Sequence, residues 1–146
     1  MEEFDNLYTD IIMEHSMNSP NKRHMLKPSC SSLGHNPNCG DEITLEVELD
    51  GDKIKDIAFT GHGCAISQSS TSIMADTLRG KTIEEAQSTI NDFISMIKRE
   101  QITEEKKDNL GDAICFENIS NMPARVKCAE LAWYTMKDII DKNTKK

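Results

Sequence analysis

Three of the five cysteines in this 146-residue chain stand in settings that suit metal binding or thiol chemistry. Cys39 lies in "NPNCGD", Cys64 ends "GHGC", and Cys128 lies in "ARVKCAE". Zinc takes such thiolates, together with histidine or carboxylate ligands, in tetrahedral sites. The chain has no CxxC pair, so a site would have to be assembled from distant segments. Spacing alone therefore leaves a buried, inert thiol as the alternative for each cysteine.

The residues next to Cys39 and Cys64 favour chemistry over an inert role. Gly40 separates Cys39 from Asp41, and its backbone freedom lets a thiolate and a carboxylate turn toward one centre. Asp41 on its own would more often be a cap or turn residue. Cys64 is expected to begin a helix, where unpaired N–H groups and the positive end of the helix dipole favour the thiolate.

Cys128 has two cations close by in the sequence, Lys127 and Arg125, which also favour a thiolate. The alternative for Cys128, a small core residue on an apolar helix face, stays open. Arg125 is expected to contact a partner or substrate, or to be a solvated helix cation. His62, between two glycines, is interpreted as a polar turn residue in preference to a ligand or an acid/base group.

The remaining cysteines and histidines carry no such setting. Cys30 lies in a serine-rich connection and Cys115 in "DAICFEN", and both are interpreted as incidental or core residues. His15, His24 and His35 have no partner at metal-ligand spacing and are expected at the surface.

A hairpin is expected between Cys39 and Cys64. The first half of the chain begins with an amphipathic helix that should end near "NSPNKRH", followed by an irregular connection over residues 26–42. Strict alternation from Ile43 to Leu49 predicts a half-buried antiparallel strand, "DGD" predicts a turn, and a second strand should run to Phe59. The break in phase between Ile54 and Ile57 indicates a bulge.

Three helices are expected after the hairpin. The first should begin at or near Cys64 and stop before Gly80; the second follows the capping box of Thr82 and Glu85. Residues 98–112 are charge-rich and are expected to be a solvated surface segment. The last helix should begin near Pro123.

Composition restricts the class of protein further. The length fits one domain spanning residues 1–146, and a net charge of −8 disfavours nucleic acid as a partner. No apolar stretch approaches the roughly 20 residues that a membrane-spanning helix needs, and the acidic start differs from a secretory leader. A cytoplasmic protein without structural disulfides is expected.

With these residues identified, the chain resembles the SufU proteins, the branch of the IscU/NifU-like family that works with cysteine desulfurases in iron-sulfur cluster biogenesis. The resemblance runs nearly end to end. "LYTDIIMEHSMNSPNK" is similar to the family's N-terminal helix, and "NPNCGD", "GHGCAIS" and "MPARVKCAELAW" are similar to its three cysteine motifs. Lys127 stands where IscU-type scaffolds usually carry a histidine, and a charge-rich stretch separates the second and third motifs, as in SufU proteins.

The resemblance implies an α+β fold, with a small antiparallel sheet and helices packed on one side. It implies a zinc ion held by Cys39, Asp41, Cys64 and Cys128, with Cys39 as the persulfide acceptor. The implied partners are a SufS-like cysteine desulfurase and SufBCD-type cluster assembly machinery. "ISQSSTS" after Cys64 departs from relatives that are richer in alanine or methionine, which concerns helix packing and not the ligands.

Three functions are compatible with these residues. The leading hypothesis is a zinc-dependent sulfurtransferase that accepts persulfide sulfur and passes it toward cluster assembly. The alternative is a noncatalytic scaffold that binds a nascent [2Fe-2S] cluster on the same thiolates; Lys127 argues against it. A zinc-stabilised interaction domain without chemistry is the third.

Overall fold

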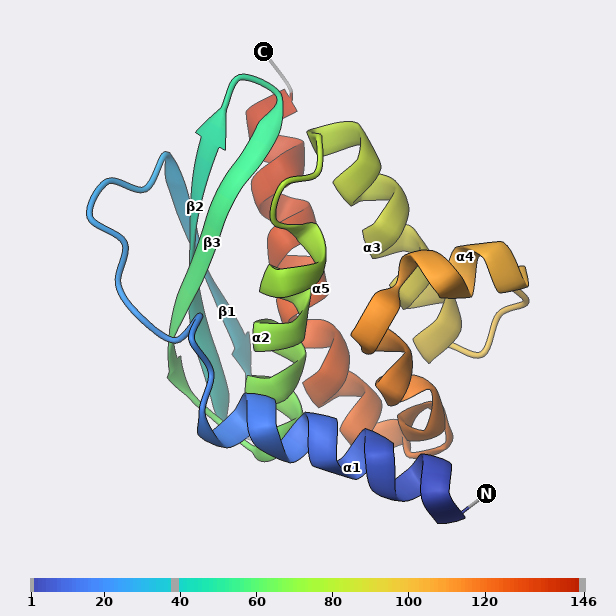
Figure 1. Cartoon of the computed structure of the whole chain (residues 1–146). Coiled ribbons are helices and arrows are strands. Elements are labelled where there is room, and N and C mark those ends of the chain that lie inside the picture. The colour runs from blue at the N-terminus through green and yellow to red at the C-terminus, as the bar shows by residue number, and fades with distance from the viewer. Residues whose placement is uncertain (1, 38–39, 145–146) are drawn as a thin grey trace.

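The computed structural model describes residues 2–37 and 40–144 of the chain as a small antiparallel sheet covered on one face by helices (Figure 1). The strand order is β1-β2-β3. The elements, in chain order, are α1 (Glu2–Met17), β1 (Cys30–Asn36), β2 (Asp41–Asp50), β3 (Lys53–His62), α2 (Ala65–Leu78), α3 (Ile83–Ile97), α4 (Glu104–Asn109), the 3₁₀ helix η1 (Gly111–Asn121) and α5 (Pro123–Thr144). The expected α+β class is confirmed.

The β2–β3 hairpin follows the alternation in the sequence. Ile43, Leu45 and Val47 point into the core and are fully buried, as are Ile57 and Phe59 on β3. The expected bulge is present, because Glu48 pairs with Asp56 while Leu49 pairs with Ile54. Lys55 is therefore the extra residue of β3, and it corrects the register so that apolar side chains on both sides of it face inward.

The expectation of an irregular connection over residues 26–42 is wrong for residues 30–36, and also for Asp41 and Glu42, which begin β2. Residues Cys30–Asn36 form β1, which pairs antiparallel with β2 along its full length. The strand has no apolar alternation, since its buried inward positions include Gly34, which lies directly against Thr135 of α5. A methyl group at Gly34 would collide with that side chain, so glycine permits the close approach of strand and helix.

The helices α2 and α5 cover the inner face of the sheet, and buried hydrogen bonds join them. A third helix, α3, packs against α5. Phe93 of α3 stacks on Trp133 of α5 with ring centroids 4.0 Å apart. The indole N–H of Trp133 donates to Ser70 Oγ of α2 at 2.9 Å, and Ser70 Oγ donates to the Ala129 carbonyl at 2.5 Å. These buried bonds fix α2, which begins directly after Cys64, against α5, which contains Cys128.

The segment after α1 is attached to the edge of β3. The amide N–H of Arg23 donates to the Phe59 carbonyl, and the Phe59 N–H donates to the Asn21 carbonyl. Arg23 and Arg79 both donate to the Asp56 carboxylate at 2.9 Å. Partial burial opposes ionisation of Asp56, but the hydrogen bonds from Arg23 and Arg79 outweigh it and lower the pKa of that carboxyl.

The helix boundaries agree well with the sequence predictions. The Thr82–Glu85 capping box is present with both of its hydrogen bonds, and α5 begins at Pro123. The charge-rich segment over residues 98–112 is mostly exposed as expected, but it contains α4, and Leu110 within it is fully buried. The surface assignment is wrong for His15, which is half-buried and whose Nδ1 lies 2.8 Å from Ser72 Oγ.

Candidate metal centre

Three of the predicted ligands come together at one end of the molecule. Asp41 is the first residue of β2, Cys64 immediately precedes α2, and Cys128 lies near the start of α5. These three elements begin at the same end, which is the lower end in Figure 1. One carboxylate oxygen and the two sulfur atoms all lie within 4.8 Å of one another. Cys39, the fourth predicted ligand, lies outside the described residues.

Asp41 is completely buried, and only one of its two carboxylate oxygens is bonded. Oδ1 accepts a hydrogen bond from the Cys64 N–H at 2.9 Å. Oδ2 is buried without a hydrogen-bond partner among residues 2–37 and 40–144. A buried, unpartnered carboxylate oxygen is costly unless a cation or proton compensates it. Two sulfur atoms beside it make a soft metal ion the fitting counterpart.

Cys64 is the N-cap residue of α2, as the sequence predicted for the start of this helix. Its sulfur accepts a hydrogen bond from the Ser67 N–H at 3.4 Å, in the place where a serine or aspartate oxygen would normally cap a helix. The side chain is half-buried. The sulfur is therefore held against the first helical turn while one side of it remains accessible.

Cys128 is buried, with 1% of its surface exposed, and its sulfur lies 3.6 Å from the Ala124 carbonyl of the preceding helical turn. Burial was expected of a core residue, yet the sulfur belongs to the same three-atom group as Asp41 and Cys64. Cys128 is therefore both a buried residue, as one interpretation of the sequence expected, and a member of the candidate centre, as the other expected.

Two glycines before α2 make room for this arrangement. A methyl group built on Gly63 would lie 2.5 Å from Asp41 Oδ1 and 3.1 Å from Ser67 Oγ. One built on Gly61, where φ is +128°, would overlap the Glu42 carbonyl of the neighbouring strand. Neither position accepts a side chain without moving the carboxylate or the strand, so close approach requires both glycines of "GHGC".

The donor set fits a tetrahedral zinc ion. With zinc–sulfur bonds of about 2.3 Å, ligand atoms in a tetrahedral site lie about 3.8 Å apart. The three donor atoms here are within 4.8 Å of one another, so small side-chain rotations bring them to that spacing. A site with three protein ligands in place leaves one position for a fourth, and Cys39 precedes Asp41 by two residues in the sequence.

The other cysteines are poor candidates for chemistry. Burial, reinforced by the nearby charge of Asp112, raises the pKa of Cys115 to about 12, so its thiol keeps its proton. Burial also raises the pKa of Cys30, which lies on β1 and not in a connecting loop. The core assignment of Cys115 is confirmed.

Exposed residues close in sequence to the three donors do not belong to the group of donors. The interpretation of His62 as a turn residue is wrong, because it is the last residue of β3 and pairs with Glu42 of β2. Its side chain is exposed. Arg125 and Lys127 are exposed on the first turns of α5. Contact of Arg125 with a partner stays a prediction.

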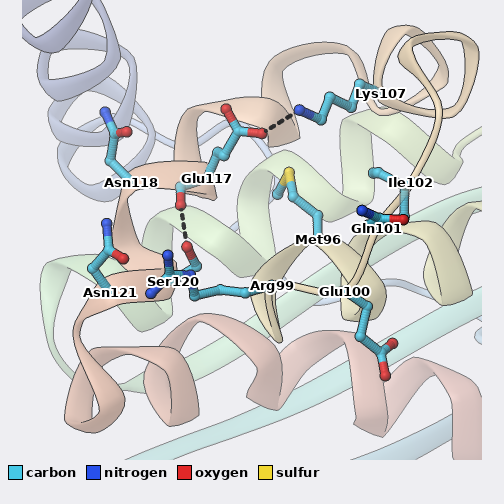
Figure 2. A pocket seen from close by; sticks show the side chains of 10 residues that line it. All are labelled: Met96, Arg99, Glu100, Gln101, Ile102, Lys107, Glu117, Asn118, Ser120 and Asn121. Carbon is cyan, nitrogen blue, oxygen red and sulfur yellow. Dashed lines mark hydrogen bonds and ion pairs between the residues drawn. The ribbon is translucent and has the colours of Figure 1, made fainter.

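A cleft of about 380 Å³ lies elsewhere, where α4 and η1 meet the end of α3 (Figure 2). Its lining contains neither cysteine nor histidine: Met96, Arg99, Glu100, Gln101, Ile102, Lys107, Glu117, Asn118, Ser120 and Asn121. Lys107 and Glu117 form an ion pair of 2.8 Å on one wall. The soft donor in this lining is the Met96 thioether, and none of the lining residues named supplies a thiolate or an imidazole to accompany it. The candidate centre therefore remains the one at the starts of β2, α2 and α5.

Comparison with known proteins places the chain in a family. The family described as "NifU-like N terminal domain" matches residues 7–129. The chain is 40% identical to the zinc-dependent sulfurtransferase SufU of Bacillus subtilis, over 88% of this chain and 86% of that protein. It is 36% identical to the iron-sulfur cluster assembly scaffold protein IscU of Streptococcus pyogenes, over 98% of this chain and 88% of that protein.

A solved structure shares the fold closely. The crystal structure of a putative iron-sulfur cluster assembly scaffold protein for the SUF system from Fervidobacterium islandicum superposes with a TM-score of 0.84 at 37% identity, covering 90% of this chain and 95% of that one. A NifU-like protein from Brucella abortus, at 24% identity and a TM-score of 0.83, shares the fold alone. None of the described helices is long and apolar enough to cross a membrane.

Substitution of Gly63 by alanine tests the steric requirement at the centre. The added methyl group displaces the Asp41 carboxylate, so we expect Gly63→Ala to lower bound zinc well below one equivalent by elemental analysis, with a loss of about 1–3 kcal/mol of stability from overpacking. Gly51→Ala is the control, because Gly51 has φ +62° but open space around it. It should lose about 1 kcal/mol and keep its zinc. A fully zinc-loaded Gly63→Ala protein would contradict the close approach.

Cys128→Ser tests whether the buried sulfur belongs to the centre. Replacing the thiolate with a hydroxyl removes a soft ligand, so zinc content should fall below one equivalent. Cys30→Ser, at the half-buried cysteine of β1, should retain the wild-type content. Equal zinc in the two purified variants would count against Cys128 as a ligand.

Proposed function

Because the chain belongs to the family of NifU-like N-terminal domains, we propose that it is a zinc-dependent sulfurtransferase that accepts persulfide sulfur from a SufS-like cysteine desulfurase. It delivers this sulfur to iron-sulfur cluster assembly, in the cytoplasm, through SufBCD-type machinery. The observation that carries the proposal is the convergence of Asp41, Cys64 and Cys128 on one point.

The residues have distinct tasks in this proposal. Asp41, Cys64 and Cys128 hold the metal, and Cys39 completes the set and accepts the sulfur. Zinc, when bound, keeps the thiolates deprotonated at neutral pH and masks their nucleophilicity. The positions of the described three support this division, because two are buried and the third is a helix cap, whereas Cys39 precedes Gly40, which has φ +68° and open space around it.

The transfer itself is a thiol–disulfide type of exchange. The Cys39 thiolate attacks the outer sulfur of the donor's persulfide, a new S–S bond forms at Cys39, and the donor's S–S bond breaks to release its own thiolate. One sulfur atom changes carrier and no net oxidation occurs. Cys39 leaves this exchange as a persulfide that a later acceptor can attack in the same way.

Two features favour the sulfurtransferase over the scaffold. The relative named as a zinc-dependent sulfurtransferase is 40% identical, and Lys127 occupies the position before the third cysteine, where scaffolds usually carry a histidine. Lys127 and Arg125 are exposed beside the buried Cys128 and so present positive charge at the rim of the centre. We propose that Arg125 contacts the partner there.

Cys39→Ala tests the acceptor role. The variant loses the proposed sulfur-accepting atom while the described fold is untouched, so stimulation of the cysteine desulfurase should disappear, with an unchanged circular-dichroism spectrum. Cys30→Ala removes a thiol that burial keeps protonated and should stimulate like the wild type. Undiminished stimulation by Cys39→Ala would refute the acceptor role.

The second candidate function is a scaffold for a nascent [2Fe-2S] cluster, favoured by the 36% identity to a protein named as such a scaffold and by soft ligands that accept iron as well as zinc. Zinc-free protein supplied with iron and sulfide separates the two candidates. The sulfurtransferase predicts a weak, unstable cluster absorption and a desulfurase rate that rises only with the zinc form. A stable cluster that transfers to an apo-ferredoxin would favour the scaffold.

A further inference from the structure

Ser67, on the first turn of α2, carries a polar group that the fold itself does not use. Its side chain is 1% exposed, and its hydroxyl has no hydrogen-bond partner within the part of the chain that the structure describes. Neighbouring hydroxyls in α2 are all bonded: Ser69 to the Ile66 carbonyl at 3.2 Å, Ser70 to Ala129, and Thr71 to the Ser67 carbonyl at 2.8 Å. An unbonded buried hydroxyl among bonded ones calls for an explanation.

The location of the hydroxyl supplies that explanation. Ser67 Oγ and Asp41 Oδ1 border the same small space, the one left by the missing side chain of Gly63, at 3.1 Å and 2.5 Å from the point where a Cβ atom would lie. The backbone N–H of Ser67 already donates to Cys64 Sγ. Ser67 is therefore next to one donor atom of the candidate centre, Cys64 Sγ, and to the carboxylate of Asp41, which supplies another.

The carboxylate of Asp41 presents its two oxygens differently. Oδ1 faces Gly63 and accepts from the Cys64 N–H, whereas Oδ2 is buried and unpartnered within the described residues. If a second donor held Oδ1 as well, the carboxylate would be fixed in rotation and Oδ2 would be the oxygen offered to an ion. Carboxylate ligands are commonly oriented by such outer hydrogen bonds.

We propose that Ser67 is a positioning residue of the metal centre: its side-chain O–H donates to Asp41 Oδ1 when an ion is bound, which leaves Oδ2 as the single ligand oxygen. Together with the Cys64 N–H, this bond holds Asp41 as a one-oxygen ligand. The inference rests on the metal site of the proposed function and adds a residue that contacts no metal itself.

The test is the rate at which zinc leaves the purified, zinc-loaded protein for an excess of a chromogenic chelator. Ser67→Ala should release zinc about 10–100-fold faster than the wild type, the usual effect of losing an outer partner. Ser69→Ala is the matched control, since its hydroxyl is equally buried, lies on the same helix and bonds only within it. It should release zinc at the wild-type rate.

Two further readouts separate this role from a general loss of structure. Ser67→Thr keeps a hydroxyl and should restore slow release, and cobalt-substituted Ser67→Ala should show a changed d–d absorption that Ser69→Ala does not. Release by Ser67→Ala at the rate of Ser69→Ala, or by Ser67→Thr at the rate of Ser67→Ala, overturns the inference alone. A wild-type protein that holds no zinc contradicts the proposed function, and the inference falls with it.

Discussion

The hydrogen bond from the Cys64 N–H to Asp41 Oδ1, 2.9 Å long, joins the start of β2 to the start of α2. These positions are 23 residues apart and belong to different layers of the fold. The bond satisfies one of the free amide groups at the helix start and neutralises part of the charge that Asp41 brings into a buried position. It also holds the Asp41 carboxylate next to Cys64, whose sulfur belongs to the same group of donor atoms, so the candidate centre depends on it.

The third donor reaches this centre because α5 is fixed against α2 close to Cys128. Ser70 connects the two helices through the Ala129 carbonyl and the Trp133 indole, one residue and five residues after Cys128. The polar side chains of α2 from Ser67 to Ser72 are all buried. Hydrogen bonds offset the free-energy cost of burying several of these polar groups. Ser67, next to the centre, has an unbonded hydroxyl, and it is the residue with a proposed role there.

Much of the fold follows from local patterns, and the failures have physical reasons. Alternation predicted the hairpin and even its bulge, because β2 and β3 bury one face. The strand β1 was missed because small and polar residues such as Gly34 occupy its buried side. Local context identified Cys64 as a helix start, but only the resemblance and then the structure united it with Asp41 and Cys128. The close contact at Gly63 and the unbonded hydroxyl of Ser67 depend on segments that are distant in the sequence, so no periodicity of apolar residues could predict them.

The central claim is that thiolates and one carboxylate share a zinc ion, and X-ray absorption at the zinc edge of the purified protein tests it directly. The account predicts a four-coordinate ion with three sulfur neighbours at about 2.3 Å and one oxygen at about 2.0 Å, since Cys39 joins Cys64, Cys128 and Asp41. A zinc ion surrounded by nitrogen and oxygen alone, or protein purified without zinc, would contradict it.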